Sequence, residues 1–140
     1  MKQEDKDLLF KDLCARLPYK VKVFYEYVDS LNNKTYGYSL TLNTWCINEL
    51  EAEKATIKPY LRPMSSMTEE EKEELYHYYC NEIADNLNTP NLTWEVRCCI
   101  SNSFGTDWLN AHHFDYRGLI PLGLAIEVTK ENNPYKEIKL

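Results

Sequence analysis

The sequence predicts an α+β fold: an N-terminal helix and an antiparallel β-hairpin or small sheet, followed by a long helix, a strand and a short helical motif. Two periodicities favour this class. Apolar residues recur every third or fourth position over residues 4–17 and 69–87, as on one face of a helix. Apolar and polar residues alternate over residues 19–28, 35–43 and 92–100, as on strands with one buried face.

The length of 140 residues is sufficient for one domain with its own core. We expect a single domain over residues 1–140, organised as four segments whose last is a frayed tail. The segments are a helix plus β unit (1–57), a proline-rich ordered linker (58–67), a helix–strand–helix part (68–128) and the tail (129–140).

The first helix is expected over residues 4–17, because Pro18 prevents its continuation. Its lysines and aspartates are predicted to face solvent, and its apolar stripe is predicted to face the core. The stripe consists of Leu9, Leu13 and Leu17, with Phe10 and Cys14 beside them.

A hairpin is the clearest feature of the next segment. Between its two predicted strands, Asp29–Lys34 carries two asparagines that tolerate a left-handed backbone. The alternation allows two tyrosines of each strand to line one face, namely Tyr25, Tyr27, Tyr36 and Tyr38. After the hairpin, Trp45–Ile47 is predicted to begin a third strand and Glu49–Ala55 to form a short helix.

The linker over residues 58–67 contains two prolines four positions apart, which favour extended or irregular backbone. The helix that follows has a defined start, because Thr68 and Glu71 have the spacing of a capping box. We expect this helix over residues 69–87, and a strand over residues 92–100 after it.

Asp107–Leu124 gathers residue types that are typical of active sites, including two of the three histidines. A short helix is expected over residues 104–114, Asp115 is expected to cap a further turn, and Gly123 to lead into a closing strand over 124–128. Large apolar side chains of this motif are predicted to be buried against the helix over 69–87. They are Trp108, Leu109, Phe114, Leu119, Ile120 and Leu124.

Composition disfavours several classes of function. Lys and Arg number 16 against 22 Asp and Glu, and the resulting formal net charge of −6 repels a nucleic-acid backbone. The sequence has neither the apolar segment of a signal peptide nor a membrane span, so we expect a cytoplasmic protein with reduced cysteines. Its four glycines form neither a P-loop nor a dinucleotide-binding fingerprint, so no cofactor is expected.

Two stretches carry a family resemblance: Lys58–Glu71, read as Lys-Pro-Tyr-Leu-Arg-Pro-Met-Ser-Ser-Met-Thr-Glu-Glu-Glu, and Asp107–Ile120 with its continuation Gly123–Val128. Together they resemble a family of short uncharacterised proteins encoded by phages and prophages of gut Bacteroidales. The chain departs from that pattern at Pro121 and over Tyr76–Ser103. The family has no established activity, so the resemblance implies only intracellular expression in a bacterial host, often from a mobile element.

No metal site is expected. Adjacent helical residues point about 100° apart, so His112 and His113 are poorly placed to share one ion. His77 and Cys80 have a ligand-compatible spacing, but the chain lacks the paired motifs of zinc sites. Structural histidines and cysteines are therefore the favoured interpretation.

Acid–base or nucleophilic chemistry would use His112 or His113 with Asp107, Asp115 or Cys99. Helix capping by a histidine and by an aspartate explains the same residues without catalysis, and we favour it. In that interpretation Arg117 pairs with a carboxylate or a carbonyl.

The sequence favours a non-enzymatic accessory protein that binds another protein, such as a host or defence factor, because tyrosine is enriched at interfaces. The candidate binding residues are Tyr25, Tyr27, Tyr36, Tyr38, His112, His113 and Arg117. The principal alternative is a small metal-dependent or His-based enzyme centred on the two adjacent histidines. A further alternative is single-strand nucleic-acid binding by the hairpin tyrosines. The pattern indicates neither the partner nor the oligomeric state.

Overall fold

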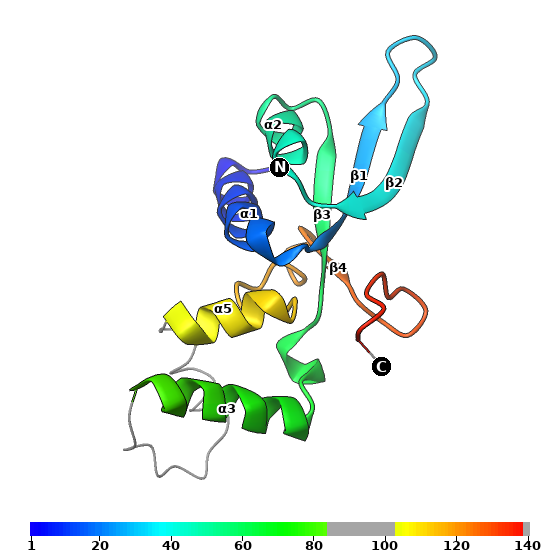
Figure 1. Cartoon of the computed structure of the whole chain (residues 1–140). Helices are drawn as coiled ribbons and strands as arrows, with labels where there is room; N and C mark the ends of the chain where they lie inside the picture. Colours follow the sequence, from blue (N-terminus) through cyan, green and yellow to red (C-terminus); the bar gives the residue numbers. More distant parts are fainter. Residues whose placement is uncertain (84–102, 139–140) are drawn as a thin grey trace.

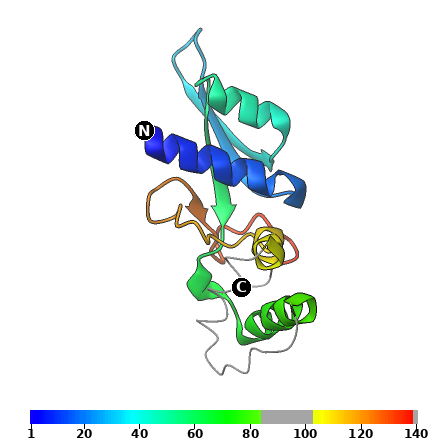
Figure 2. The same cartoon turned by 90° about the vertical axis from the view of Figure 1, so that its left-hand side faces the viewer.

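The computed structural model describes residues 1–83 and 103–138, and it confirms the mixed α+β class. Helices α1 (Gln3–Arg16) and α2 (Thr44–Glu51) lie on one side of a four-stranded sheet (Figure 1). Turned by 90°, the molecule shows the hairpin projecting beyond both helices (Figure 2). The sheet order is β2-β1-β3-β4, and the strands are β1 (Lys22–Val28), β2 (Thr35–Thr41), β3 (Thr56–Leu61) and β4 (Ile126–Glu127).

The predicted hairpin is confirmed. Strands β1 and β2 are antiparallel, with Tyr25 opposite Tyr38 and Tyr27 opposite Tyr36. The first strand begins later than predicted, because a 3₁₀ turn precedes it and Lys20 takes a left-handed backbone with φ of 57°. The register places the four tyrosines on one face of the hairpin.

Helix α1 agrees with the predicted range, but the predicted faces need correction. Leu9 and Leu13 are buried as expected, whereas Asp12 and Arg16 are also fully buried and Cys14 is exposed. The four buried residues follow the i, i+3, i+4, i+7 spacing of a single helix face. The prediction that every aspartate of this helix faces solvent is therefore wrong.

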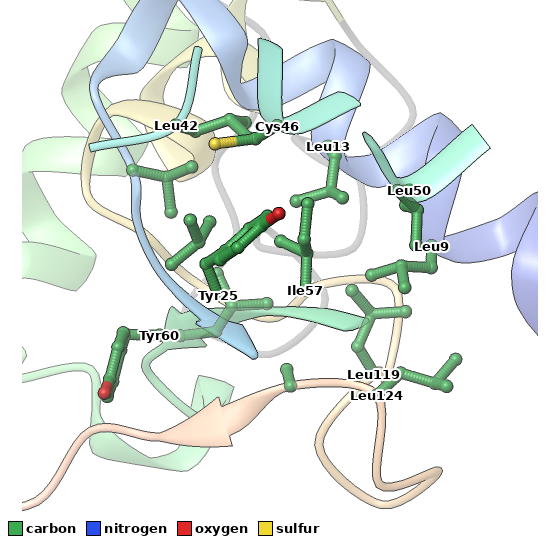
Figure 3. Close-up of a cluster of buried hydrophobic side chains, with 14 of the residues drawn as sticks. Leu9, Leu13, Tyr25, Leu42, Cys46, Leu50, Ile57, Tyr60, Leu119 and Leu124 are labelled. Carbon is green, nitrogen blue, oxygen red and sulfur yellow. The ribbon is translucent and has the colours of Figure 1, made fainter. Parts of the chain in front are cut away.

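The main core lies between the sheet and helices α1 and α2, and its side chains are shown in Figure 3. Tyr25 of β1 lies in this cluster with Leu13 of α1 and Ile57 of β3. Leu119 and Leu124 complete the cluster from the C-terminal part of the chain.

The prediction of a third strand at Trp45–Ile47 is wrong, because these residues lie in the first turn of α2. The side chain of Asn43 caps this helix by accepting a hydrogen bond from Cys46 N at 3.0 Å. Buried residues Cys46, Ile47 and Leu50 then follow the helical period rather than alternation.

The backbone of residues 58–61 is extended as predicted, but the predicted role of residues 58–67 as a linker is wrong, because these first residues belong to strand β3 inside the sheet. Pro59 pairs with Val23 of β1 in the antiparallel register. A proline is tolerated there because the other neighbour, β4, pairs only with Tyr60 and Leu61. The segment is therefore structural core rather than a connection.

The capping box at the start of α3 (Glu69–Ile83) is confirmed. Thr68 Oγ1 accepts from Glu71 N, and Glu71 Oε1 accepts from Thr68 N, both at 3.1 Å. The rest of the predicted helix, residues 84–87, and the predicted strand over 92–100 lie outside the described residues.

Helix α5 (Ser103–Ala111) agrees with the predicted short helix and lies beside α3 (Figure 1). Three of the six motif side chains predicted to pack on α3 form a second buried cluster with Leu75 of that helix and with Met67. They are Trp108, Leu109 and Phe114.

The other three side chains pack elsewhere, so that part of the prediction is wrong. Leu119 and Leu124 are buried in the sheet core, and Ile120 packs against the same core. Asp115 sets this path, because its carboxylate accepts from Leu119 N at 2.8 Å and from Ile120 N at 2.9 Å. Gly123, with φ of 73°, then turns the chain toward β4 as expected.

The prediction of a frayed tail is wrong for residues up to 138. Tyr135 is buried in the main core, and its hydroxyl donates to Tyr60 O at 2.7 Å. The same hydroxyl accepts from Lys22 N at 3.0 Å, so the tail fastens β1 to β3. Such a long-range contact leaves no local pattern in the sequence.

Candidate functional site

Five aromatic side chains gather on the side of the hairpin that faces the helices. The rings of Tyr25 and Tyr38 lie 5.4 Å apart, and those of Tyr27 and Tyr36 lie 5.8 Å apart. Trp45 of α2 joins them, with its ring 5.0 Å from that of Tyr25. We call this group the aromatic face: Tyr25, Tyr27, Tyr36, Tyr38 and Trp45.

The aromatic face changes from buried to open along the hairpin. Tyr25 is 4% exposed, whereas Tyr36, Tyr38 and Trp45 are 41%, 44% and 46% exposed. Helices α1 and α2 cover the inner end of the hairpin and stop before its tip (Figure 2). Burial, and next the Glu49 carboxylate, raises the pKa of Tyr25, so its hydroxyl stays protonated. The aromatic face is therefore a continuation of the core into solvent.

An open pocket of about 630 Å³ adjoins the aromatic face beside Tyr27. Its apolar wall includes Leu50 and Ala55, and its rim carries an ion pair between Lys6 and Glu53. The hydrogen bond from Lys6 holds the pKa of Glu53 below its ordinary value. Apolar walls with a charged rim suit an inserted side chain of a partner.

His112 lies on the outer side of the contact between α3 and α5. Its ring stacks on Trp108 at 3.9 Å, and its Nδ1 donates to Trp108 O at 2.9 Å. Because Nδ1 carries the proton, Nε2 of the neutral ring has a lone pair, and it lies 3.8 Å from Glu74 Oε1. The same carboxylate oxygen accepts from Trp108 Nε1 at 3.1 Å.

His113 has a different environment. It is 3% exposed, has a left-handed backbone with φ of 64°, and stacks on Tyr135 at 3.9 Å. Burial, and next the positive charge of Arg16, lowers the pKa of His113 to about 3. Its carbonyl accepts from Arg62 N at 2.8 Å, so both backbone and ring serve packing.

The two histidines do meet at one feature, an open pocket of about 410 Å³ that both line. Arg62 and Glu71 also line it, joined by two hydrogen bonds of 2.7 Å. Although burial opposes the charge of Glu71, Arg62 holds the pKa of that carboxyl below its ordinary value. Within residues 1–83 and 103–138, no three His, Cys, Asp or Glu side chains are placed to hold a metal ion. His77 is exposed on α3.

Arg117 pairs with a carboxylate, as the sequence predicted. Its Nη1 donates to Asp12 Oδ1 at 2.9 Å, while Arg16 Nε donates to Asp12 Oδ2 at 2.7 Å. The ring of Tyr116 lies against both guanidinium groups, 4.6 Å from Arg117 and 5.2 Å from Arg16. Arg16 also donates to Phe114 O at 2.7 Å, so the group ties α1 to the C-terminal motif.

Comparison with known proteins identifies no relative. No protein-family model, curated protein or solved structure matches the chain. The resemblance to phage and prophage proteins stays a prediction. Among the described residues, no helix is long and apolar enough to cross a membrane.

The sequence analysis missed Trp45 of the aromatic face and the buried charges Asp12 and Arg16, although each has a recognisable pattern in the sequence. Trp45 follows Asn43 by two positions, and an asparagine before an apolar run indicates the start of a helix. That pattern would have predicted a helix rather than a strand at Trp45. Asp12 and Arg16 lie four residues apart on the helix face that carries the buried leucines, which is the spacing of a paired buried charge. The exposure of the remaining candidate residues was not predictable from the sequence.

Proposed function

We propose that this chain is a non-enzymatic protein-binding module whose contact surface is the aromatic face of the hairpin. The observation that carries the proposal is the exposure of Tyr36, Tyr38 and Trp45, each above 40%, beside buried Tyr25. Tyrosine and tryptophan supply much of the binding energy at protein interfaces, because they bury a large area with few rotatable bonds. The adjoining pocket beside Tyr27 offers a place for one side chain of the partner.

The resemblance to phage and prophage proteins supports a cytoplasmic setting for this module. The proposed partner is a bacterial host or defence protein. The net charge of −6 adds support, since it disfavours nucleic acid as the alternative ligand of the exposed tyrosines.

The test compares the wild-type chain with a Tyr36→Ala/Tyr38→Ala variant as baits in Bacteroidales lysate. A Leu122→Ala variant is the matched control, because Leu122 is 52% exposed but lies outside the hairpin. We expect at least one protein to be captured by wild type and by the control and lost with the double variant.

That protein is then purified and its dissociation constant measured by calorimetry. We expect the double variant to weaken binding about ten-fold or more. Equal affinities for wild type and the double variant would remove the aromatic face as the contact surface.

A His-based enzyme is the second candidate function, and the pocket shared by His112 and His113 is the observation that favours it. The lone pair on His112 Nε2 would serve as the general base, since His113 is buried. Elemental analysis of the purified protein tests the metal-dependent version, for which stoichiometric zinc is the expected result. Loss of any measured hydrolytic activity in His112→Ala, with His77→Ala unaffected, would support the metal-free version.

A further inference from the structure

Strand β2 is the edge of the sheet, and the described residues place no strand on its outer side. Its seven residues, Thr35–Thr41, contain no charge and no proline, and most of them are exposed. Monomeric proteins usually protect such an edge with a lysine, a proline, a bulge or a covering loop. Here strand β2 pairs with β1 without interruption from Thr35 to Thr41, so no bulge blunts the edge.

The register shows which backbone groups are available on that edge. Leu42 N donates to Val21 O at 2.9 Å, and Asp29 N donates to Lys34 O at 2.8 Å. In an antiparallel pair, the N–H and C=O of one residue face the neighbouring strand, and those of the next residue face away from it. The even-numbered residues of β2 therefore face β1. The outward N–H and C=O groups belong to Thr35, Gly37, Ser39 and Thr41.

We propose that β2 pairs with β2 of a second copy of this chain, antiparallel about a two-fold axis at Tyr38. In this register Gly37 exchanges hydrogen bonds with the partner's Ser39, and Thr35 does so with the partner's Thr41. All four outward residues of each copy are then paired, and Tyr38 lies opposite the partner's Tyr38 in a non-hydrogen-bonded pair. Two four-stranded sheets join into one continuous sheet.

The side chains of β2 favour a second copy because their pattern is self-complementary about Tyr38. Tyr36 lies opposite the partner's Leu40 on the aromatic side, while small polar side chains meet on the other side. Strand β2 itself carries no charge, and Lys34, which precedes it, lies about eight residues, or roughly 27 Å, from Lys34 of the second copy. That separation exceeds the screening length of about 8 Å, so these two lysines do not oppose the contact.

The dimer does not rest on the proposed partner binding, although both use Tyr36 and Tyr38. The dimer depends on the backbone edge of β2, whereas the partner is proposed to contact the whole aromatic face, including Trp45 of α2. Dimerisation would place two aromatic faces side by side on one sheet surface and so give two contact sites per assembly.

The test compares two substitutions of opposite charge at Thr35, which is exposed. In the dimer Thr35 lies opposite the partner's Thr41, whose hydroxyl accepts from Lys22 Nζ of its own chain at 2.6 Å. A Thr35→Lys variant therefore places two ammonium groups near each other, whereas Thr35→Glu places a carboxylate there. Because the axis repeats the contact, we expect the dimer dissociation constant of Thr35→Lys to exceed that of Thr35→Glu about ten-fold at low salt.

Sedimentation equilibrium over a concentration series measures these constants. The wild type and Thr35→Glu are expected to reach twice the chain mass of 16.6 kDa, and Thr35→Lys to dissociate at higher concentration. Amide hydrogen exchange should show Gly37 and Ser39 protected in the wild-type dimer and exchanging faster in Thr35→Lys. A wild type that stays at the chain mass throughout, or a dimer that neither variant changes, overturns the proposal. Trp45 lies on α2 and outside β2, so loss of partner capture in Trp45→Ala with the dimer intact bears on the proposed function alone.

Discussion

The aromatic face and the Asp107–Leu124 motif both carry residue types of functional sites, but the fold treats them in opposite ways. In the motif, Asp115 caps two backbone amides, Arg117 pairs with Asp12, and His113 is stacked and buried. On the aromatic face, three rings remain more than 40% exposed. The first region uses its polar groups in internal contacts, whereas in the second the described residues leave Tyr36, Tyr38 and Trp45 partly open to solvent.

One tryptophan from each region shows the contrast most directly. Trp108 is 5% exposed, stacks against Phe114, and donates its Nε1 proton to Glu74. Trp45 is 46% exposed, and its ring packs against that of Tyr25 on the hairpin. The same residue type therefore contributes to stability in one region and to an open surface in the other. Cover by other elements, rather than residue type, distinguishes them.

The largest expected effect on stability separates Trp108→Ala from Trp45→Ala. Trp108→Ala removes a fully packed ring from the cluster between α3 and α5, so we expect unfolding free energy to fall by about 3–5 kcal/mol. Trp45→Ala should cost about 1 kcal/mol or less, because nearly half of its surface is already in water. Urea denaturation of the two variants beside the wild type measures both values.

Equal losses in the two variants would contradict the comparison. If Trp108→Ala cost less than about 1 kcal/mol, the second cluster would not be a core.

A second test uses pH, because His113 makes the motif sensitive to acid. Its pKa is about 3 in the folded chain and 6.5 ordinarily, so the unfolded chain binds a proton between these values and the folded chain does not. Stability contributed by neutral His113 is complete above pH 6.5 and is lost as pH falls toward 3. The slope approaches about 1.4 kcal/mol per pH unit within that window.

His113→Asn is the control, because asparagine accepts the left-handed backbone but does not titrate. The variant should be less stable at pH 7, since stacking on Tyr135 is lost. Between pH 6 and pH 4 its unfolding free energy should fall less steeply than that of wild type, while carboxylates contribute equally to both. Parallel curves would show that His113 is not the proton-linked group.

Local patterns in the sequence predicted local structure well. The hairpin and the Thr68–Glu71 capping box follow from neighbouring residues, and the structure confirms both. Strand β3 was missed because prolines argue against a strand until the short pairing of β4 is known. Tyr135 was missed because its partner, Tyr60, is 75 residues away.

The candidate site was only half predictable, for a related reason. Alternation could bring Tyr25, Tyr27, Tyr36 and Tyr38 together on one face, but it could not say that the helices stop before the hairpin tip. Likewise, the histidines could be placed on separate faces of the motif. The burial of His113 depends on Tyr135, which comes from outside that pattern.

The smallest expected effect on stability concerns the contact between Phe24 and Gly37, on the side of the hairpin opposite the aromatic face. The Phe24 ring lies over Gly37 on the opposite side of the hairpin, and a Cβ at Gly37 would lie 2.3 Å from the end of that ring. Gly37→Ala should cost about 1 kcal/mol in urea denaturation, because the half-buried ring must swing away from the strand. In a Phe24→Ala background the same change should cost nothing or stabilise slightly, since alanine is favoured over glycine in a strand. A cost that is the same in both backgrounds would mean that the ring does not cover Gly37. The exposed tyrosines would then owe their arrangement to the strand register alone.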